Sequence, residues 1–450
     1  MKILLTSKDC NIGGTETFVL ALSAALQRAG HDCEVFFFSR GALAAQLPAA
    51  CVAHFGGLAE CLRLVAQRRF DVVHATCAEW GLGIAAVRQL GAKLVVTNHY
   101  YKTSGWTSRH CDAYTTVSRW LAETQQPATD LPMQVVYNGI ELERFQPGVE
   151  DPLENTAVAL EAPIVAWVGR GTAAEQKQLH LVAALAPALQ RAGMRLWLAE
   201  PEGPLAVRRV LPEAADVLQA TAEVWRAVPP AEMPAFYRAV AASGGCLLTT
   251  SRYEAFGLAL AEAQACGCPV IGPDLGAINE VVRPEHGGVL YPPALAPAAL
   301  AELIVTTVQD AVGMRSRRAA CVAFVRERFS HARMAAEYLR VYEQAPLPRL
   351  HTRAARRARW QLAPLTNWPE YLNWRWPVGV RQYETAQQLA AQGEWPIAAA
   401  AARAAWAMCP SLYLRPRRLA HLLKAQARAV AHRSRRVPPP LQPAEEKAAP

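Results

Sequence analysis

Short apolar runs alternate with amphipathic segments through most of the chain, and this alternation limits the possible folds more than any other feature. In the first 150 residues the predicted strands and the helices between them fall at 2–5, 17–29, 33–38, 58–68, 72–74 and 94–97. Runs that are apolar at every position indicate strands buried on both faces, as in a parallel sheet covered by helices. The pattern predicts a doubly wound α/β domain.

A second series of the same kind begins at residue 163. Its predicted strands and helix fall at 163–168, 178–191, 195–199, 246–249 and 270–271. Two such series in tandem predict two Rossmann-like doubly wound domains with a cleft between them, and ligands at the carboxyl ends of the strands. Residues 145–162, rich in proline and charge, are the expected linker. We place the first domain at 1–157 and the second at 158–345.

The texture of the chain changes after residue 345. Residues 351–360 are rich in arginine, and three tryptophans stand between prolines at 368–376. Residues 383–409 predict a helical hairpin, broken near Gly393, that resembles one tetratricopeptide-like unit. We expect residues 346–436 to form a basic, tryptophan-rich helical extension and the Pro-, Ala- and Glu-rich residues 437–450 to be a disordered tail.

The basic character of the chain lies in this extension. From residue 346 onward 17 Lys and Arg stand against 5 Asp and Glu, which leaves 30 basic and 33 acidic residues before it. Arginines with interfacial tryptophans predict contact with an anionic membrane surface through residues 346–436. A solvated basic helix with tryptophans packed on the body is the alternative. No recognised nucleic-acid-binding module occurs, so no nucleic-acid partner is expected.

The N-terminus and the cysteines indicate a cytoplasmic location. The apolar run at residues 3–5 is far too short for a signal peptide, and no stretch approaches the roughly 18 apolar residues of a membrane span. The 11 cysteines are scattered without a Cys-x-x-Cys pair, so a disulfide framework or zinc ribbon is not expected.

The chemistry is concentrated in residues 252–263. A turn containing Gly257 follows the strand at 246–249 and leads into a helix, and it offers free backbone N–H groups to an anion. Glu254 and Glu262 flank this turn. Because carboxylates repel a diphosphate, these two side chains suit the hydroxyl groups of a sugar and a ribose.

With residues 265–280, this region resembles the donor-binding region of family 4 glycosyltransferases, the large group of retaining enzymes with the GT-B fold. Its members carry two glutamates separated by seven residues, the spacing of Glu254 and Glu262. The resemblance covers roughly residues 1–345, and its other landmarks occur in the family's order at residues 13–16, 30–31, 117–121, 137–140, 145, 168–170 and 177. Gln178 stands where the family usually has glycine.

The resemblance implies transfer of a sugar, with retention, from a nucleotide diphosphate sugar to a glycan or lipid-linked acceptor in cell-surface polysaccharide synthesis. With the basic extension, it predicts peripheral attachment on the inner face of the plasma membrane. Arg170 and Lys177 would neutralise the leaving diphosphate, Glu254 would lie near the donor sugar, and Glu262 would bind the ribose hydroxyls. The remaining donor-binding residues would be Gly13, Gly14, Phe256, Gly257 and Leu258. No metal or cofactor is expected, because the chain contains no Asp-x-Asp motif and side-chain cations would replace the metal.

Two histidines follow or end predicted strands. His99 comes just after the strand at 94–97, and the resemblance implies contact with the donor sugar, although Tyr100 stands where the family commonly has aspartate. His74 matches no motif, and we expect it to be structural.

Two other functions compete with this interpretation. Residues 169–174 fit the dinucleotide fingerprint G-x-G-x-x-A, which is typical of an NAD(P)-dependent oxidoreductase, but the acidic candidate Glu200 lies about thirty residues on instead of about twenty. The chain is alternatively a non-catalytic binding subunit with a nucleotide-sugar fold.

Overall fold

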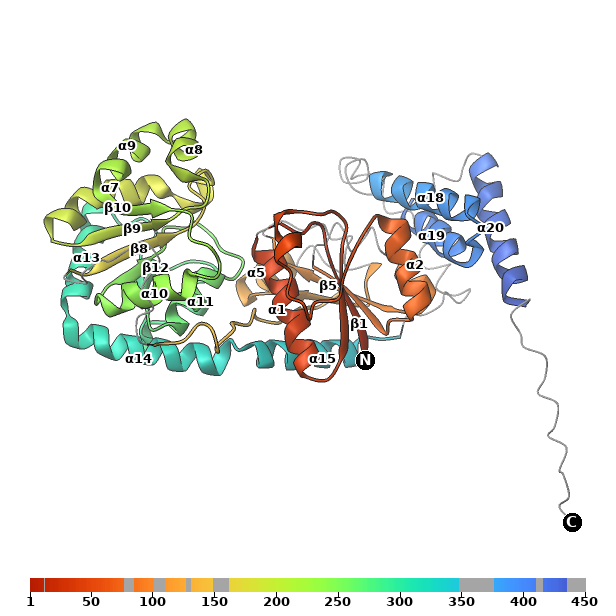
Figure 1. Cartoon of the computed structure of the whole chain (residues 1–450), viewed down its shortest axis with the longest axis horizontal. Coiled ribbons are helices and arrows are strands. Elements are labelled where there is room, and N and C mark those ends of the chain that lie inside the picture. The colour runs from red at the N-terminus through yellow and green to blue at the C-terminus, as the bar shows by residue number, and fades with distance from the viewer. Residues whose placement is uncertain are drawn as a thin grey trace, which may run out of the picture.

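The computed structural model describes residues 1–11, 13–76, 85–100, 110–126, 131–148, 162–347, 376–409 and 416–434. Two α/β domains lie side by side, and a helical extension lies beyond the first of them (Figure 1). The predicted tail at 437–450, the arginine-rich residues 351–360, Trp368, Trp374 and the predicted boundary at 157/158 lie outside the described residues.

The first domain is built on seven parallel strands in the order β3-β2-β1-β4-β5-β6-β7. The strands are β1 Lys2–Ser7, β2 Asp32–Phe37, β3 Ala53–Phe55, β4 Val72–Ala75, β5 Lys93–Asn98, β6 Ala113–Thr116 and β7 Met133–Val135. The helices are α1 Gly14–Arg28, η1 Ala42–Gln46, α2 Leu58–Arg68, η2 Ala85–Leu90 and α5 Arg119–Gln125.

The second domain has six parallel strands in the order β10-β9-β8-β11-β12-β13. Its strands are β8 Ile164–Val168, β9 Arg195–Ala199, β10 Ala222–Arg226, β11 Cys246–Leu248, β12 Val270–Pro273 and β13 Val289–Tyr291. Its helices are α6 Ala174–Lys177, α7 Leu179–Arg191, α8 Gly203–Val210, α9 Pro212–Thr221, α10 Met233–Ala242, α11 Leu258–Ala265, α12 Ile278–Val281, η4 Pro284–His286, α13 Pro297–Gln309, α14 Ala311–Arg328 and α15 His331–Gln344.

Both faces of the first sheet are buried, as the apolar runs predict. Successive side chains of a strand point to opposite faces, and Ile3 and Leu5 enter one core while Leu4 enters another. The first core is completed by α15, which runs from the second domain beneath the first (Figure 1). Tyr338 and Tyr342 of α15 are fully buried there.

The extension packs on the other face of the first domain. Its helices are α18 Trp376–Ala391, α19 Trp395–Met408 and α20 Pro416–Ser434. Leu389 and Ala398 share a core with Leu62 of α2, and Arg63 Nε lies 2.5 Å from Glu394 Oε1. The predicted helical hairpin is therefore present, and it is a docked part of the first domain.

Each sheet has a point where the strand order reverses, between β1 and β4 and between β8 and β11. Loops that leave neighbouring strands in opposite directions leave a crevice at this point, which is where open α/β sheets bind ligands. The loops after β8 and β11 carry Arg170, Lys177 and Glu254. None of the helices that the structure describes is long and apolar enough to cross a membrane.

Candidate functional site

The loop after β8 is hydrogen-bonded through its backbone to a buried carboxylate. Glu200 is fully buried at the end of β9, and its Oε1 accepts hydrogen bonds from the backbone N–H groups of Gly171 (3.1 Å) and Glu202 (3.1 Å). Its Oε2 accepts another from Gly203 N (2.6 Å). A Cβ at Gly171 would lie 2.5 Å from Val207 Cγ2, so only glycine fits there. These contacts fix the backbone next to Arg170, whose side chain is exposed.

The same geometry argues against a dinucleotide fold. The oxygens of Glu200 are occupied by backbone amides, and the G-x-G turn leads into α6, which has only four residues. A dinucleotide-binding turn leads directly into a helix whose N-terminus receives the pyrophosphate. Glu200, the acidic candidate for ribose binding in the dinucleotide interpretation, instead holds the backbone of the loop after β8.

Lys177 and Glu254 form an ion pair that joins the loops after β8 and β11. Lys177 Nζ lies 2.6 Å from Glu254 Oε1, and both side chains are partly buried. Two hydrogen bonds to backbone carbonyls support the pair: Arg252 N donates to Gln176 O (2.8 Å), and Thr250 Oγ1 donates to Lys177 O (2.6 Å). The predicted diphosphate cation and the predicted sugar carboxylate therefore lie together.

The backbone conformation at Gln178 explains why the family usually has glycine after the lysine. The backbone there is left-handed, with φ of 47°, a conformation that glycine adopts without steric cost. With its side-chain amide oriented to satisfy both neighbours, Gln178 donates to Thr250 O (2.8 Å) and accepts from Arg252 Nε (3.0 Å). The departure from the family pattern keeps the turn and adds side-chain links to the β11 loop.

The turn before α11 requires glycine at its last residue. Gly257 has φ of 96°, and an added Cβ would lie 2.8 Å from Leu260 Cδ1. The ring of Phe256 is buried, 5.2 Å from that of Phe329, so its side chain belongs to the core. Leu260 N and Ala261 N donate to the Gly257 carbonyl (3.0 and 3.2 Å), whereas the N–H groups of Leu258 and Ala259 have no acceptor within the helix itself.

Glu262 lies one turn further along α11. Its Oε2 is 3.4 Å from the Tyr237 hydroxyl, and burial raises the pKa of the Glu262 carboxyl from about 4.5 to about 7, against the opposing influence of Arg144 and Tyr237. Near neutral pH this side chain both donates and accepts hydrogen bonds, which suits a ribose diol.

The opening loop of the first domain reaches the second domain at this place. A Cβ on Gly14 would lie 3.8 Å from Leu258 Cδ1, which puts the glycine loop against the first turn of α11. A Cβ on Gly13 would lie 2.6 Å from Glu16 Oε2. Glu16, which belongs to the sequence landmark at 13–16 but had no predicted role, accepts a hydrogen bond from Ser7 Oγ at the end of β1 (3.1 Å), and burial raises its pKa.

His99 directly follows β5 and lies against α1. Its ring centroid is 4.5 Å from that of Phe18, and burial lowers its pKa to about 3, so the imidazole is neutral at physiological pH. Its buried Nε2 has no hydrogen-bond partner in the described part of the chain. His74 is structural, as expected: its two ring nitrogens bond to Tyr342 Oη (2.7 Å) and Thr97 Oγ1 (2.6 Å).

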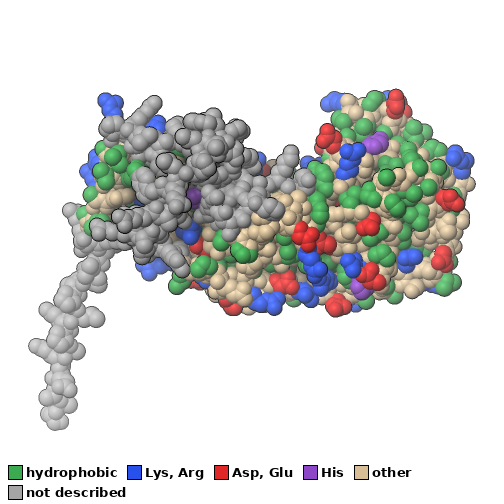
Figure 2. Space-filling model, turned by 180° about the vertical axis from the view of Figure 1, so that it is seen from behind, with side chains coloured by type: hydrophobic (Ala, Val, Ile, Leu, Met, Phe, Trp, Pro, Cys, Tyr) green, Lys and Arg blue, Asp and Glu red, His purple; other side chains and the backbone are tan. Residues whose placement is uncertain are grey.

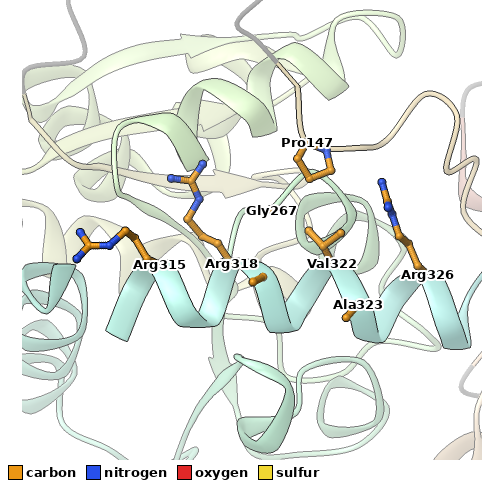
Figure 3. A pocket seen from close by; sticks show the side chains of 8 residues that line it. Pro147, Gly267, Arg315, Arg318, Val322, Ala323 and Arg326 are labelled. Carbon is orange, nitrogen blue, oxygen red and sulfur yellow. The ribbon is translucent and has the colours of Figure 1, made fainter. Parts of the chain in front are cut away.

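A groove of about 690 Å³ lies elsewhere, along α14 (Figure 3). Its lining residues are Pro147, Gly267, Arg315, Arg318, Ala319, Val322, Ala323 and Arg326. No predicted site residue lines it, and Gly267 marks the opposite end of α11 from Leu258. The groove is therefore separate from the site built around Lys177 and Glu254.

Known proteins resemble this chain in both domains. The family model "Glycosyltransferase Family 4" matches residues 12–144, and the model "Glycosyl transferases group 1" matches residues 162–310. A D-inositol 3-phosphate glycosyltransferase of Streptomyces bingchenggensis is 31% identical over 50% of this chain and 53% of its own length. An alpha-maltose-1-phosphate synthase of Mycolicibacterium smegmatis is 31% identical over 54% of this chain and 67% of its own length. Against the first of these relatives, the chain spans about half of the curated protein's length.

Solved structures agree on the fold. The Anabaena protein Alr3699/HepE, crystallised with UDP and glucose, superimposes with a TM-score of 0.63 at 18% identity, over 76% of this chain and all of that one. A glycosyltransferase of Rickettsia africae gives a TM-score of 0.65 at 17% identity, over 76% of this chain and 98% of that one. The two parallel sheets, the ordered sequence landmarks and these similarities establish that the chain belongs to glycosyltransferase family 4 and has the GT-B fold.

Proposed function

We propose that this protein transfers a sugar, with retention of anomeric configuration, from a nucleotide diphosphate sugar to a glycan or lipid-linked acceptor. The observation that carries the proposal is the Lys177–Glu254 pair. It joins the loops after β8 and β11 at the strand-order reversal, on the sheet edge where this fold binds ligands.

Each residue has a distinct part in the proposed reaction. The bond between the anomeric carbon and the diphosphate breaks, the acceptor oxygen forms the glycosidic bond, and the acceptor's proton passes to the leaving phosphate oxygen. Arg170 and Lys177 stabilise the negative charge that grows on the leaving diphosphate, together with the backbone N–H groups at the start of α11. Glu254 accepts hydrogen bonds from donor-sugar hydroxyls, Glu262 binds the ribose, and the neutral His99 contacts the sugar. No metal ion is needed in this scheme.

The relatives support this class of substrate without fixing its members. The Anabaena neighbour was crystallised with UDP and with UDP-glucose, and the curated relatives are named for transfer to inositol phosphate and for maltose-1-phosphate synthesis. We therefore place a nucleoside diphosphate, with uridine as the first base to test, in the loops after β8 and β11. A role in cell-surface polysaccharide synthesis in the cytoplasm is part of the same proposal.

We also propose peripheral attachment to an anionic membrane through the extension. Residues 416–434 contain no Asp or Glu, and Arg417, Lys424 and the 56% exposed Leu423 lie on the outer surface of α20. By contrast, acidic and basic side chains are interspersed on the face of the second domain that Figure 2 shows. The double variant Arg417→Glu/Lys424→Glu should lose flotation with anionic vesicles, whereas Arg340→Glu on α15 should keep it. Equal flotation of both variants contradicts the attachment.

A thermal-shift panel of nucleotides and nucleotide sugars tests the donor proposal. Ligand at 100 times its dissociation constant adds about 2.7 kcal/mol to folding stability. We expect one nucleoside diphosphate and its sugars to stabilise the protein, and Arg170→Ala to remove the effect. A response to nicotinamide dinucleotides alone would overturn the proposal, and binding without transfer to any acceptor would favour a non-catalytic binding subunit.

A further inference from the structure

Glu280 of α12 holds the two domains together through backbone hydrogen bonds. Its Oε2 accepts from Arg119 N (2.9 Å) and its Oε1 from Trp120 N (2.8 Å), at the start of α5 in the first domain. The Tyr137 hydroxyl donates to the same Oε2 (2.7 Å). These partners lie 143 to 161 residues away in the sequence.

The contact completes the hydrogen bonding of the first turn of α5. The first N–H groups of a helix have no acceptor within it. Ser118 Oγ accepts from Leu121 N (3.2 Å), and Glu280 accepts from the two N–H groups before it. Of these three N–H groups, one thus bonds to a local side chain and two bond to the other domain.

The loop that carries Glu280 meets α5 at a second point. Gly276 has φ of 55°, and an added Cβ would lie 3.3 Å from Cδ2 and Cε2 of the Trp120 indole. The loop is closed by a hydrogen bond from Asn279 Nδ2 to Asp274 Oδ1 (3.1 Å). Residues 274–280 therefore rest on Trp120 through both backbone packing and the Glu280 carboxylate.

This loop opens toward the proposed donor site. It follows β12, the neighbour of β11 in the parallel sheet, so its start lies on the same edge as the loop of Glu254. The two carboxylate oxygens of Glu280 accept three hydrogen bonds from the protein itself, so the side chain has a structural role. Burial and the neighbouring Glu280 raise the pKa of Tyr137 to about 12, so its hydroxyl stays protonated and keeps donating.

We propose that Glu280 is a positioning residue that fixes the loop at 274–280 to α5 and thereby holds this wall of the donor site in place. The inference rests on the proposed function for its effect on donor use, while the link between the domains is measurable without any ligand. Glu280 acts through the loop and does not touch the reacting atoms.

The test compares Glu280→Ala, Glu280→Gln and Tyr137→Phe with Glu285→Gln, a control whose half-exposed carboxylate pairs with Arg283. Hydrogen exchange of peptides covering residues 117–126 reports the link, and donor KM and kcat report its use. For Glu280→Ala we expect faster exchange at Arg119 and Trp120 and about a tenfold higher donor KM, with kcat within about threefold of wild type. Glu280→Gln, which keeps one acceptor oxygen, should lie in between, and Tyr137→Phe, which removes one bond, should raise donor KM about two- to threefold.

Unchanged exchange in Glu280→Ala overturns the link between the domains, and faster exchange with an unchanged donor KM overturns its coupling to the donor site. If Glu280→Ala does not fold, the Gln and Phe variants give the same two readouts. If the wild-type protein uses no nucleotide sugar, the proposed function fails, and the exchange data still decide whether Glu280 links the domains.

Discussion

The Lys177 ammonium and the Glu254 carboxylate, 2.6 Å apart, tie the loop after β8 to the loop after β11. Each is the other's ion-pair partner, so a change at either residue affects both loops. A diphosphate that approaches Lys177 meets a cation whose position is already fixed, which is the condition for preorganised charge stabilisation.

Lys177→Ala should lower kcat/KM by about 100- to 1,000-fold, because it removes a cation from the leaving diphosphate. Steady-state kinetics with a nucleotide sugar measure this loss. Arg340→Ala, which removes a cation that is 63% exposed on α15, should change the rate by less than about twofold. Similar losses in the two variants would show that Lys177 has no special part in the reaction.

Glu262→Gln should remove a pH dependence of folding stability. Burial raises the pKa of Glu262 from about 4.5 to about 7, so between these values the native state binds more protons than the unfolded state. The contribution of Glu262 to the free energy of unfolding therefore falls as pH rises from about 4.5 to about 7, by roughly 1–3 kcal/mol. Urea denaturation of both proteins from pH 5 to pH 8 should show a gain for the variant that grows with pH. A difference in unfolding free energy that stays constant with pH would show that burial does not raise the pKa of Glu262.

Gly171→Ala should destabilise the protein and weaken donor binding together. The new Cβ would lie 2.5 Å from Val207 Cγ2, so the loop beside Arg170 must shift. We expect the free energy of unfolding to fall by about 1–3 kcal/mol and the donor KM to rise. Gly148→Ala is the matched control, since its nearest neighbour is the flexible side chain of Arg238 at 3.5 Å. A normal donor KM in Gly171→Ala would mean that this loop does not bind the donor.

Transfer should continue without divalent metal ions. The proposed site uses Arg170, Lys177 and helix N–H groups where other sugar transferases use a metal. Rates measured in excess EDTA and in Mg²⁺ should agree within about twofold. A rate that falls in EDTA and returns with Mg²⁺ would replace this scheme with a metal-assisted one.

His99 should not titrate in the working pH range. Because burial lowers its pKa to about 3, the imidazole stays neutral from pH 5 to pH 8. His99→Ala should lower the transfer rate without removing any inflection of the pH–rate profile in that range. Loss of an inflection near pH 6.5 in this variant would show that the histidine is protonated during the reaction.

Local pattern predicted the sheets and the main site segments. Buried strands such as β1 and β8 are continuous apolar runs, and the turn at Gly257 is marked by glycine before a helix. Strands β3, β6, β7, β10 and β13 were not among the predicted strands. Strands β3, β7 and β13 have only three residues each, and those of β3 are only partly buried. The roles of Glu280 and Glu200 could not be predicted from the sequence, because their carboxylates bind backbone N–H groups that only the tertiary fold brings near. Residues 117–121 and 137–140 were noticed only as family landmarks, and the structure gives them a physical task at the domain contact.

The burial of α15 against the first sheet, and of α18 and α19 against the helices α2 and η2, has a consequence for synthesis of the chain. The sheet begins at Lys2, yet one of its faces is completed by Tyr338 and Tyr342 of α15, and the core on its other side includes Leu389 of α18 and Ala398 of α19. Chains emerge from the ribosome at about 5–20 residues per second, so the apolar side chains of the sheet stay exposed for many seconds before these helices are made. The domain that is made first is therefore finished last, and nascent chains stalled before residue 330 should bind chaperones that recognise exposed apolar surface.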